Sequence, residues 1–397
     1  MKRLSTALIW IALGCANDAP ADADTAVARD AAVTRDGAFT FDATMAHDAA
    51  IATDAAVEPR LRYGVNIHHG GASFAANQQL ADLLQPRGMR TVRMDFNYDD
   101  DPTLVRDQIT RLAAAGIRAE AVLFPSYQWS TSCTLDLAMA EASAYDQTRT
   151  MVAALQDLVT DFELMNEVTL RSTLEAEVPP WDLMDASAYH GMPCYAVQAA
   201  VLHGMTHAIR DAAVTFGRPF RVIAGAVGRG WGYLSFLREQ GIDFDVLGYH
   251  IYPSEGQAPL DTDPWFGTGG LFAQLAQFHR PVQINELDCG EIYDASFVNQ
   301  PGGTLTEQCL RSVRNHLLEI SRQTSVEVES VHFYEMFDEP DKAPPENRFG
   351  LWYSPTAPKV LLLLATAFSG GTLSDAEASE VTSRGLLTTA QITAFRQ

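Results

Sequence analysis

Short apolar runs alternate with longer amphipathic stretches along the chain from Arg60 onward. The apolar runs are rich in Val, Ile, Leu and Phe, which is typical of strands buried on both faces. One amphipathic stretch, residues 104–115, ends at Gly116, and a glycine there is a helix C-cap signal. Strands that alternate with helices predict a parallel sheet in an α/β fold.

Eight such strands can be counted. We predict them at residues 63–68, 91–96, 118–124, 162–165, 220–224, 244–250, 282–285 and 329–334, with helices at 77–84, 104–115, 195–216 and 359–368. Eight strands with intervening helices predict a (β/α)8 TIM barrel. Two cap signatures, Ser374-x-x-Glu377 and Thr388-x-x-Gln391, predict short helices after the barrel.

The first 58 residues have a different pattern. Met1-Lys2-Arg3 and the apolar run 4–13 form a secretory signal that is too short for a transmembrane helix. The run ends at Ala12-Leu13-Gly14-Cys15, which resembles a bacterial lipobox with Cys15 as the lipidated residue. An ordinary signal peptide cut nearby is the alternative. We expect an exported protein, anchored by lipid to the outer membrane or cell surface, or else periplasmic or secreted.

Residues 16–58 are rich in Ala and Asp, and Asp recurs at every sixth position from Asp18 to Asp54. A six-residue repeat can signal a β-helix, but these residues would make only about two coils, too few to bury a core alone. We therefore prefer a loosely ordered stalk as the interpretation. We divide the chain into a signal peptide (1–14), this spacer (15–58), the barrel (59–370) and a tail that packs on the barrel (371–397).

Charge and cysteine content narrow the possible partners. The net charge of −22 argues against nucleic acid, whose binding needs clustered Lys and Arg. Beyond Cys15 the chain has four cysteines, Cys133, Cys194, Cys289 and Cys309. An even count in an exported protein indicates disulfides, and three pairings are possible. We favour Cys289–Cys309 and Cys133–Cys194; a zinc site is the alternative, although no Cys-x-x-Cys spacing supports it.

Two glutamates are candidates for chemistry. Glu167 and Glu286 each close a predicted strand, the fourth and the seventh, and loop residues follow both. Barrel enzymes carry their chemistry at the C-terminal ends of strands. Two carboxylates placed there indicate an acid/base and a nucleophile that face one substrate bond.

Tryptophans support a carbohydrate substrate. Trp129, Trp181, Trp231, Trp265 and Trp352 each lie in a segment that follows a predicted strand. In a barrel those segments form the active-site face, and broad aromatic rings stack on sugar rings. Packing of a long loop would explain any single Trp, but all five on one face favour a sugar-binding cleft. Trp129 and Trp231 are our candidate contacts.

Taken together, the ordered motifs of residues 60–370 resemble the retaining glycoside hydrolases of clan A, including families 5 and 39. The motifs are Arg93 on the second strand, Asn166-Glu167 on the fourth, His250-Ile251-Tyr252 on the sixth and Glu286 on the seventh. The strand-eight position departs from the pattern, because Tyr334 or Glu335 stands where many members have Trp.

The resemblance implies roles for these residues. Glu167 would be the acid/base and Glu286 the nucleophile, with the two carboxyls about 5–5.5 Å apart. Arg93 and Tyr252 would hold Glu286 charged, Asn166 would bind the sugar 2-hydroxyl, and His250, Tyr334 and His68 would line the substrate. No cofactor is required. A second His, His69, could contact sugar or simply pack a loop.

The sequence therefore predicts a monomeric retaining glycosidase that cleaves β-linked poly- or oligosaccharide. Its only membrane contact would be the lipid anchor. A catalytically silent carbohydrate-binding protein on the same barrel is one alternative, and the altered strand eight is the only feature in its favour. A transglycosylase is another, because it shares every catalytic residue.

Overall fold

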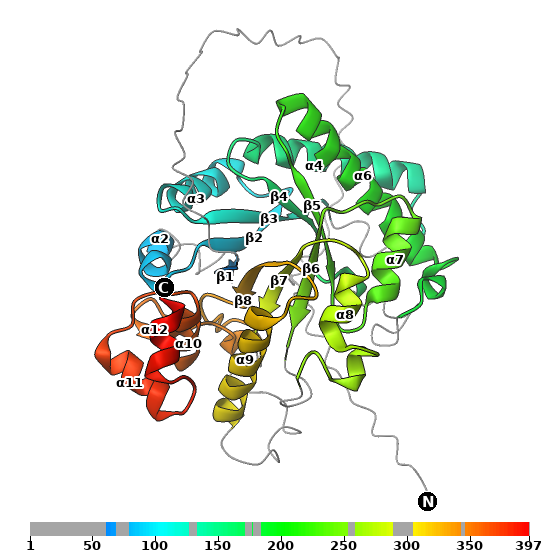
Figure 1. Ribbon diagram of the computed structural model, residues 1–397. Coiled ribbons are helices and arrows are strands. Elements are labelled where there is room, and N and C mark those ends of the chain that lie inside the picture. Colours follow the sequence, from blue (N-terminus) through cyan, green and yellow to red (C-terminus); the bar gives the residue numbers. More distant parts are fainter. Residues whose placement is uncertain are drawn as a thin grey trace, which may run out of the picture. The chain divides into compact units, whose positions relative to one another are not determined.

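Eight parallel strands close into one barrel in the computed structural model of the chain, with helices around its outside (Figure 1). The strands follow sequence order, and β1 pairs with both β2 and β8. They are β1 (Arg62–Ile67), β2 (Thr91–Asn97), β3 (Arg118–Phe124), β4 (Asp161–Leu164), β5 (Arg221–Ala226), β6 (Val246–Ile251), β7 (Val282–Leu287) and β8 (Val328–Phe333). The predicted (β/α)8 TIM barrel is confirmed.

The structure describes residues 61–68, 79–126, 133–170, 177, 184–252, 259–288, 305–342 and 346–396. The helices there are α2 (Leu80–Leu84), α3 (Pro102–Ala114), α4 (Leu137–Leu155), α6 (Pro193–Phe216), α7 (Trp231–Glu239), α8 (Gly270–Ala276), α9 (Leu305–Arg322), α10 (Val360–Phe368), α11 (Asp375–Ser383) and α12 (Thr389–Phe395). The predicted helices match α2, α3, α6 and α10 closely. Helices α4, α7, α8 and α9 had not been located from the sequence.

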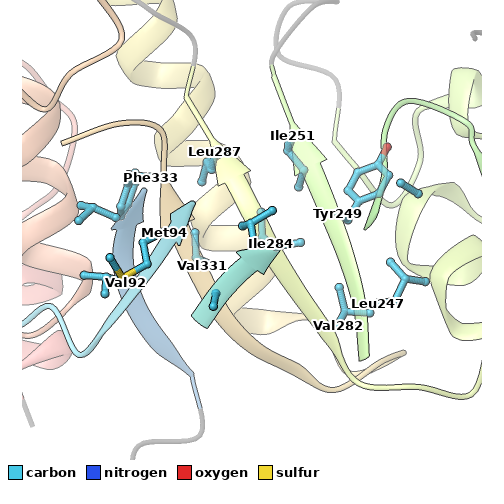
Figure 2. Packing of buried hydrophobic residues seen from close by; sticks show 14 of the residues in the cluster. Val92, Met94, Leu247, Tyr249, Ile251, Val282, Ile284, Leu287, Val331 and Phe333 are labelled. Atoms are coloured by element: carbon cyan, nitrogen blue, oxygen red, sulfur yellow. The ribbon is translucent and has the colours of Figure 1, made fainter. Parts of the chain in front are cut away.

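The apolar core lies between the strands and the helices. Figure 2 shows buried side chains along β2, β6, β7 and β8, among them Val92, Met94, Leu247 and Tyr249. Successive side chains of a strand point to opposite faces. The residues between them, such as Arg93 and Gly248, therefore face the inside of the barrel.

The inside of the barrel is polar. Arg93, Glu163 and Asn285 are buried and joined by hydrogen bonds there. Two glycines on the neighbouring strands β5 and β6 provide the room. A Cβ on Gly248 would lie 2.7 Å from Nδ2 of Asn285, and one on Gly225 would lie 3.2 Å from Oε1 of Glu163. The barrel therefore encloses a hydrogen-bonded charge network below the strand ends.

Cysteine pairing agrees with the sequence where it can be followed. Cys133 and Cys194 form a disulfide that joins the segment before α4 to the first turn of α6. Cys309 is also disulfide-bonded, and Cys289 lies outside the described residues.

The tail forms α11 and α12. Both begin with the predicted capping boxes, at Ser374 and Thr388. The ring of Phe395 packs on that of Phe368 of α10 at 4.6 Å, so the tail lies against the barrel's last helix. The signal sequence, Cys15 and the spacer lie outside the described residues. Within the part that is described, every helix is too short or too polar to cross a membrane.

Candidate active site

Glu167 and Glu286 both lie where strands reach the C-terminal end of the barrel. Glu286 is the penultimate residue of β7, and Glu167 follows the end of β4. The backbone between β4 and Glu167 is unusual, because Met165 and Glu167 both have positive φ, at 65° and 44°. Such conformations cost non-glycine residues about 1–3 kcal/mol each and concentrate at functional sites. From this turn the Glu167 side chain reaches His250 of β6.

The two carboxyl groups are close. An oxygen of Glu167, an oxygen of Glu286 and a ring nitrogen of His250 all lie within 4.8 Å of one another. Nδ1 of His250 is 2.9 Å from Oε1 of Glu167 and 3.4 Å from Oε2 of Glu286. Retaining glycosidases hold their carboxyl groups about 5–5.5 Å apart, and inverting ones about 6.5–9.5 Å. The spacing favours direct attack on a sugar by one carboxylate.

Two donors hold Glu286. Arg93 donates from one terminal nitrogen to Oε1 at 3.1 Å, and the Tyr252 hydroxyl donates to Oε2 at 2.5 Å. These are the contacts expected from the sequence. Since an Arg nitrogen can only donate and the hydroxyl is donating, both Glu286 oxygens act as acceptors. The arrangement binds the carboxylate form and fixes its orientation.

An irregularity in β7 aims Glu286 at this position. The pairing register shifts between Ile284 and Leu287 against β8, and His250 of β6 pairs with Glu286 rather than Asn285. Asn285 and Glu286 therefore both reach the inside of the barrel, while Ile284 and Leu287 lie in the outer core (Figure 2). Bulges of this kind often re-aim a side chain beside an active site.

Burial works against the charge on Glu286. Loss of water around the group raises the pKa of Glu286 above its ordinary value. The interaction with His250 lowers it, the Glu167 charge raises it, and Arg93 and the Tyr252 hydroxyl lower it. The two donors therefore oppose the effect of burial and favour the carboxylate form of Glu286.

Arg93 organises the layer beneath. Its exposure is 2%, and it donates to both oxygens of Glu163, at 2.6 and 3.0 Å. It also donates to Oδ1 of Asn166 at 2.7 Å and to Oδ1 of Asn66 at 2.8 Å. Its charge is thus shared between Glu163 and Glu286. The Asn166 contact fixes the orientation of that side-chain amide.

A second acid, Glu120, completes this layer. Asn285 donates to both Glu120 and Glu163, at 3.1 and 2.8 Å. Burial raises the pKa of Glu120 well above its usual range, and the Glu163 charge raises it further. Burial and the neighbouring acid therefore both favour the protonated form of Glu120, while Arg93 donates to Glu163 and Glu286.

His250 lies between the two catalytic candidates as a neutral group. Burial lowers the pKa of His250, and the attraction of the Glu286 charge does not reverse the shift. A neutral imidazole at Nδ1 can donate one hydrogen bond to a carboxylate without compensating its charge. The Glu167–His250–Glu286 set also has the donor types of a metal site, but the Arg93 cation 3.1 Å from Glu286 disfavours a second cation beside the same carboxylate.

His68 and Tyr334 form one wall of the site. Nδ1 of His68 lies 2.6 Å from Asp95, and Nε2 lies 3.2 Å from the Tyr334 hydroxyl. Burial opposes charge on this ring, but Asp95 and then Glu335 raise the pKa of His68 to about 9. Tyr334 is 3% exposed, and its ring lies edge-on to Tyr252 at 6.4 Å. The buried Tyr334 ring therefore supports His68 and Tyr252.

The tryptophan prediction needs correction. Trp231 is 5% exposed and stacks on Tyr249, whose side chain points away from the barrel interior, so Trp231 packs the core instead of facing a sugar. Trp352 is also buried, against Phe337. Trp265 is partly buried under the Arg229 guanidinium. Trp129, Trp181 and His69 lie outside the described residues.

Comparison with known proteins gives one match in sequence and many in fold. No protein-family model matches the chain. An arabinogalactan endo-β-1,4-galactanase from Cellvibrio japonicus (strain Ueda107) is 28% identical over 205 residues, which is 50% of this chain and 46% of the relative. The chain thus spans about half the length of the curated relative that it matches.

The solved structures that resemble the chain share its barrel. A family 39 glycoside hydrolase from Bacteroides cellulosilyticus WH2 has a TM-score of 0.55 and 15% identity, covering 77% of this chain and 63% of that one. A family 1 β-glucosidase from Thermotoga maritima has a TM-score of 0.53 and 10% identity, covering 79% and 98%. At such identities the likeness establishes the TIM-barrel fold.

Proposed function

We propose that the chain is a retaining glycoside hydrolase that cleaves β-linked poly- or oligosaccharide. The observation that carries the proposal is the pair of carboxylates at the barrel mouth, with oxygens within 4.8 Å of each other. One of them, Glu286, is held by Arg93 and Tyr252, while Glu167 has only 12% of its side chain exposed and contacts His250. One group is arranged as a nucleophile and the other as an acid/base.

In the first step, a Glu286 oxygen attacks the anomeric carbon of the sugar. The bond from that carbon to the leaving oxygen breaks, and Glu167 gives its proton to the leaving oxygen. The product is a sugar joined to Glu286 by an ester bond. Protonation of the leaving group is what requires a second carboxyl on the opposite side of the bond.

In the second step, Glu167 is ionised and takes a proton from water. The water oxygen attacks the anomeric carbon, and the bond to Glu286 breaks. Two displacements at one carbon return the original configuration. Asn166, whose Oδ1 is held by Arg93, would bind the sugar 2-hydroxyl, a contact that strengthens in the transition state.

We take β-1,4-linked galactan as the first substrate to test. The matched relative is a galactanase, and it shares 28% of the aligned positions. Galactan is therefore tested before glucan, mannan and xylan.

The test compares the purified protein with Glu286→Ala on these four glycans and on aryl β-glycosides. Glu239→Ala, an exposed glutamate paired with His190, is the matched control. We expect the protein and the control to release reducing sugar and Glu286→Ala to lose nearly all activity. Binding without cleavage would favour the carbohydrate-binding alternative. Longer oligosaccharides as the main products would show transglycosylation.

We also propose export and lipidation at Cys15, on the sequence of the first 15 residues. Labelling with a palmitate analogue in a bacterial host tests this directly. The expected result is a labelled, detergent-extracted protein and an unlabelled Cys15→Ser variant. Equal labelling of both would refute lipidation at Cys15. Light scattering on the purified protein tests the expected monomer.

A further inference from the structure

Three metal-binding side chains meet on the outer helices, away from the strand ends. His203 and His207 of α6 are four residues apart, and their rings lie 4.0 Å apart by centroid. Glu141 of α4 reaches them, with Oε1 2.9 Å from Nδ1 of His203. One ligand atom from each of the three lies within 4.8 Å of the others.

The packing of α4 against α6 creates this meeting. The two helices lie side by side in Figure 1. A Cβ on Gly204 would lie 2.2 Å from the backbone oxygen of Glu141, so only glycine allows the helices to approach this closely. The Cys133–Cys194 disulfide joins the starts of the same two helices. Glu141 and His203 are therefore held in register on a braced pair.

We propose that Glu141, His203 and His207 bind a divalent transition metal ion of the Zn²⁺ class. Two imidazoles and one carboxylate are a ligand set that Zn²⁺ accepts, with water as the fourth ligand. Bonds of about 2.0–2.1 Å place tetrahedral ligand atoms about 3.3 Å apart. The Glu141–His203 pair, at 2.9 Å, needs to separate only slightly to accept the ion, and His207, which is exposed, can rotate to close the site.

The bound ion forms a second cross-link between α4 and α6. The disulfide holds the starts of these helices, and the ion joins them further along, at Glu141 and His203. Because an ion that binds only the folded state stabilises it, the protein gains thermal stability from the metal. The site lies on helices, whereas the proposed catalytic carboxylates lie at strand ends, so metal binding and catalysis are separable.

The experiment is calorimetric titration of Zn²⁺ into the purified protein without a polyhistidine tag, with melting curves in parallel. We compare His207→Ala, chosen because His207 is exposed, and Glu141→Gln with His190→Ala. His190 is the matched control, since it pairs with Glu239 at 2.7 Å but, among the described residues, belongs to no three-ligand cluster. Glu167→Gln tests for Zn²⁺ bound at the catalytic cluster instead.

We expect one saturable site and a melting temperature raised by several degrees in the protein and in His190→Ala and Glu167→Gln. His207→Ala and Glu141→Gln should weaken binding at least about tenfold and lose the thermal shift. Equal binding by all variants would overturn the proposal, as would binding that Glu167→Gln alone removes. Neither readout depends on glycosidase activity, so failure here leaves the proposed function untouched.

Discussion

Removing one oxygen atom from Tyr252 should move the pH dependence of catalysis. Tyr252 donates to Oε2 of Glu286 at 2.5 Å, and Arg93 holds the other oxygen. Tyr252→Phe keeps the ring between Tyr334 and Phe349 and deletes only this hydrogen bond. The variant therefore isolates one of the two donors that favour the charged nucleophile.

The direction and size of the change in the pKa of Glu286 follow from this hydrogen bond. A donor to a carboxylate favours the ionised form and lowers its pKa. A hydrogen bond to a charged group is worth about 1.5–3 kcal/mol, and about 1.4 kcal/mol corresponds to one pH unit. Without it, the pKa of Glu286, already raised by burial, should rise by a further ~1–2 units.

The assay is kcat/KM against pH on an aryl glycoside, because its acid limb reports the nucleophile in the free enzyme. The acid limb should move to higher pH by about 1–2 units in Tyr252→Phe. Tyr145→Phe is the control, because the Tyr145 hydroxyl donates to Asp211 at 2.8 Å on the surface and should change nothing. An unmoved acid limb, or one that moves to lower pH, would refute this assignment of Glu286.

Three further changes test the surroundings of the site. Arg93→Met leaves the buried Glu163 and Glu286 without their shared cation and should lower the free energy of unfolding by about 3–5 kcal/mol. Arg106→Met, at an exposed ion pair, should lower it by less than about 1 kcal/mol. Similar losses for the two variants in urea unfolding would contradict the buried network. The pKa of His68 is raised in the folded state from 6.5 to about 9. The charged His68 ring therefore contributes fully to the free energy of unfolding below pH 6.5, and this contribution is lost as pH rises to about 9. Asp95→Asn should remove most of this pH dependence, and an unchanged slope of stability over that range would rule out the pair as its source. Gly248→Ala places a Cβ 2.7 Å from Asn285 and should destabilise the folded protein by about 1–3 kcal/mol. Gly225→Ala, with a contact of 3.2 Å, should destabilise it less. The reverse order of melting temperatures would contradict this packing.

The barrel was predictable because its signal is local. Each strand is buried on both faces and therefore has a short apolar run, and α3 ends just before Gly116, which has a positive φ of 74°. Helix α4 lacks a strong apolar stripe: residues 137–155 are rich in small and polar residues such as Ala140, Ala144 and Thr148. These small residues suit the close contact with α6, which no local pattern reveals.

The site was predictable only in part. Glu167, Glu286 and Tyr252 stand at strand ends, and Arg93 lies within β2; the order of the strands fixes their neighbours. Glu120 and Glu163 were missed, although each is a charged residue within an apolar strand, because their burial becomes evident only when the barrel closes. The register shift in β7 and the inward position of Asn285 likewise depend on pairing between strands.

Trp231 shows the opposite error. Its place after β5 is on the expected side of the barrel, and its ring is nevertheless buried against Tyr249. Position in the chain gives the segment on which a residue lies, but the direction of a side chain depends on the helix phase. Here Trp231 is the first residue of α7 and faces the sheet.

Covalent labelling tests the central claim most directly. A 2-fluoro sugar with a good leaving group slows both steps, so the ester to the nucleophile accumulates and the modified peptide is found by mass spectrometry. We predict one added sugar per protein, located on Glu286, with turnover restored as the ester is hydrolysed. An active enzyme that stays unlabelled, or that carries the sugar on Glu167, would contradict the assignment of the two glutamates.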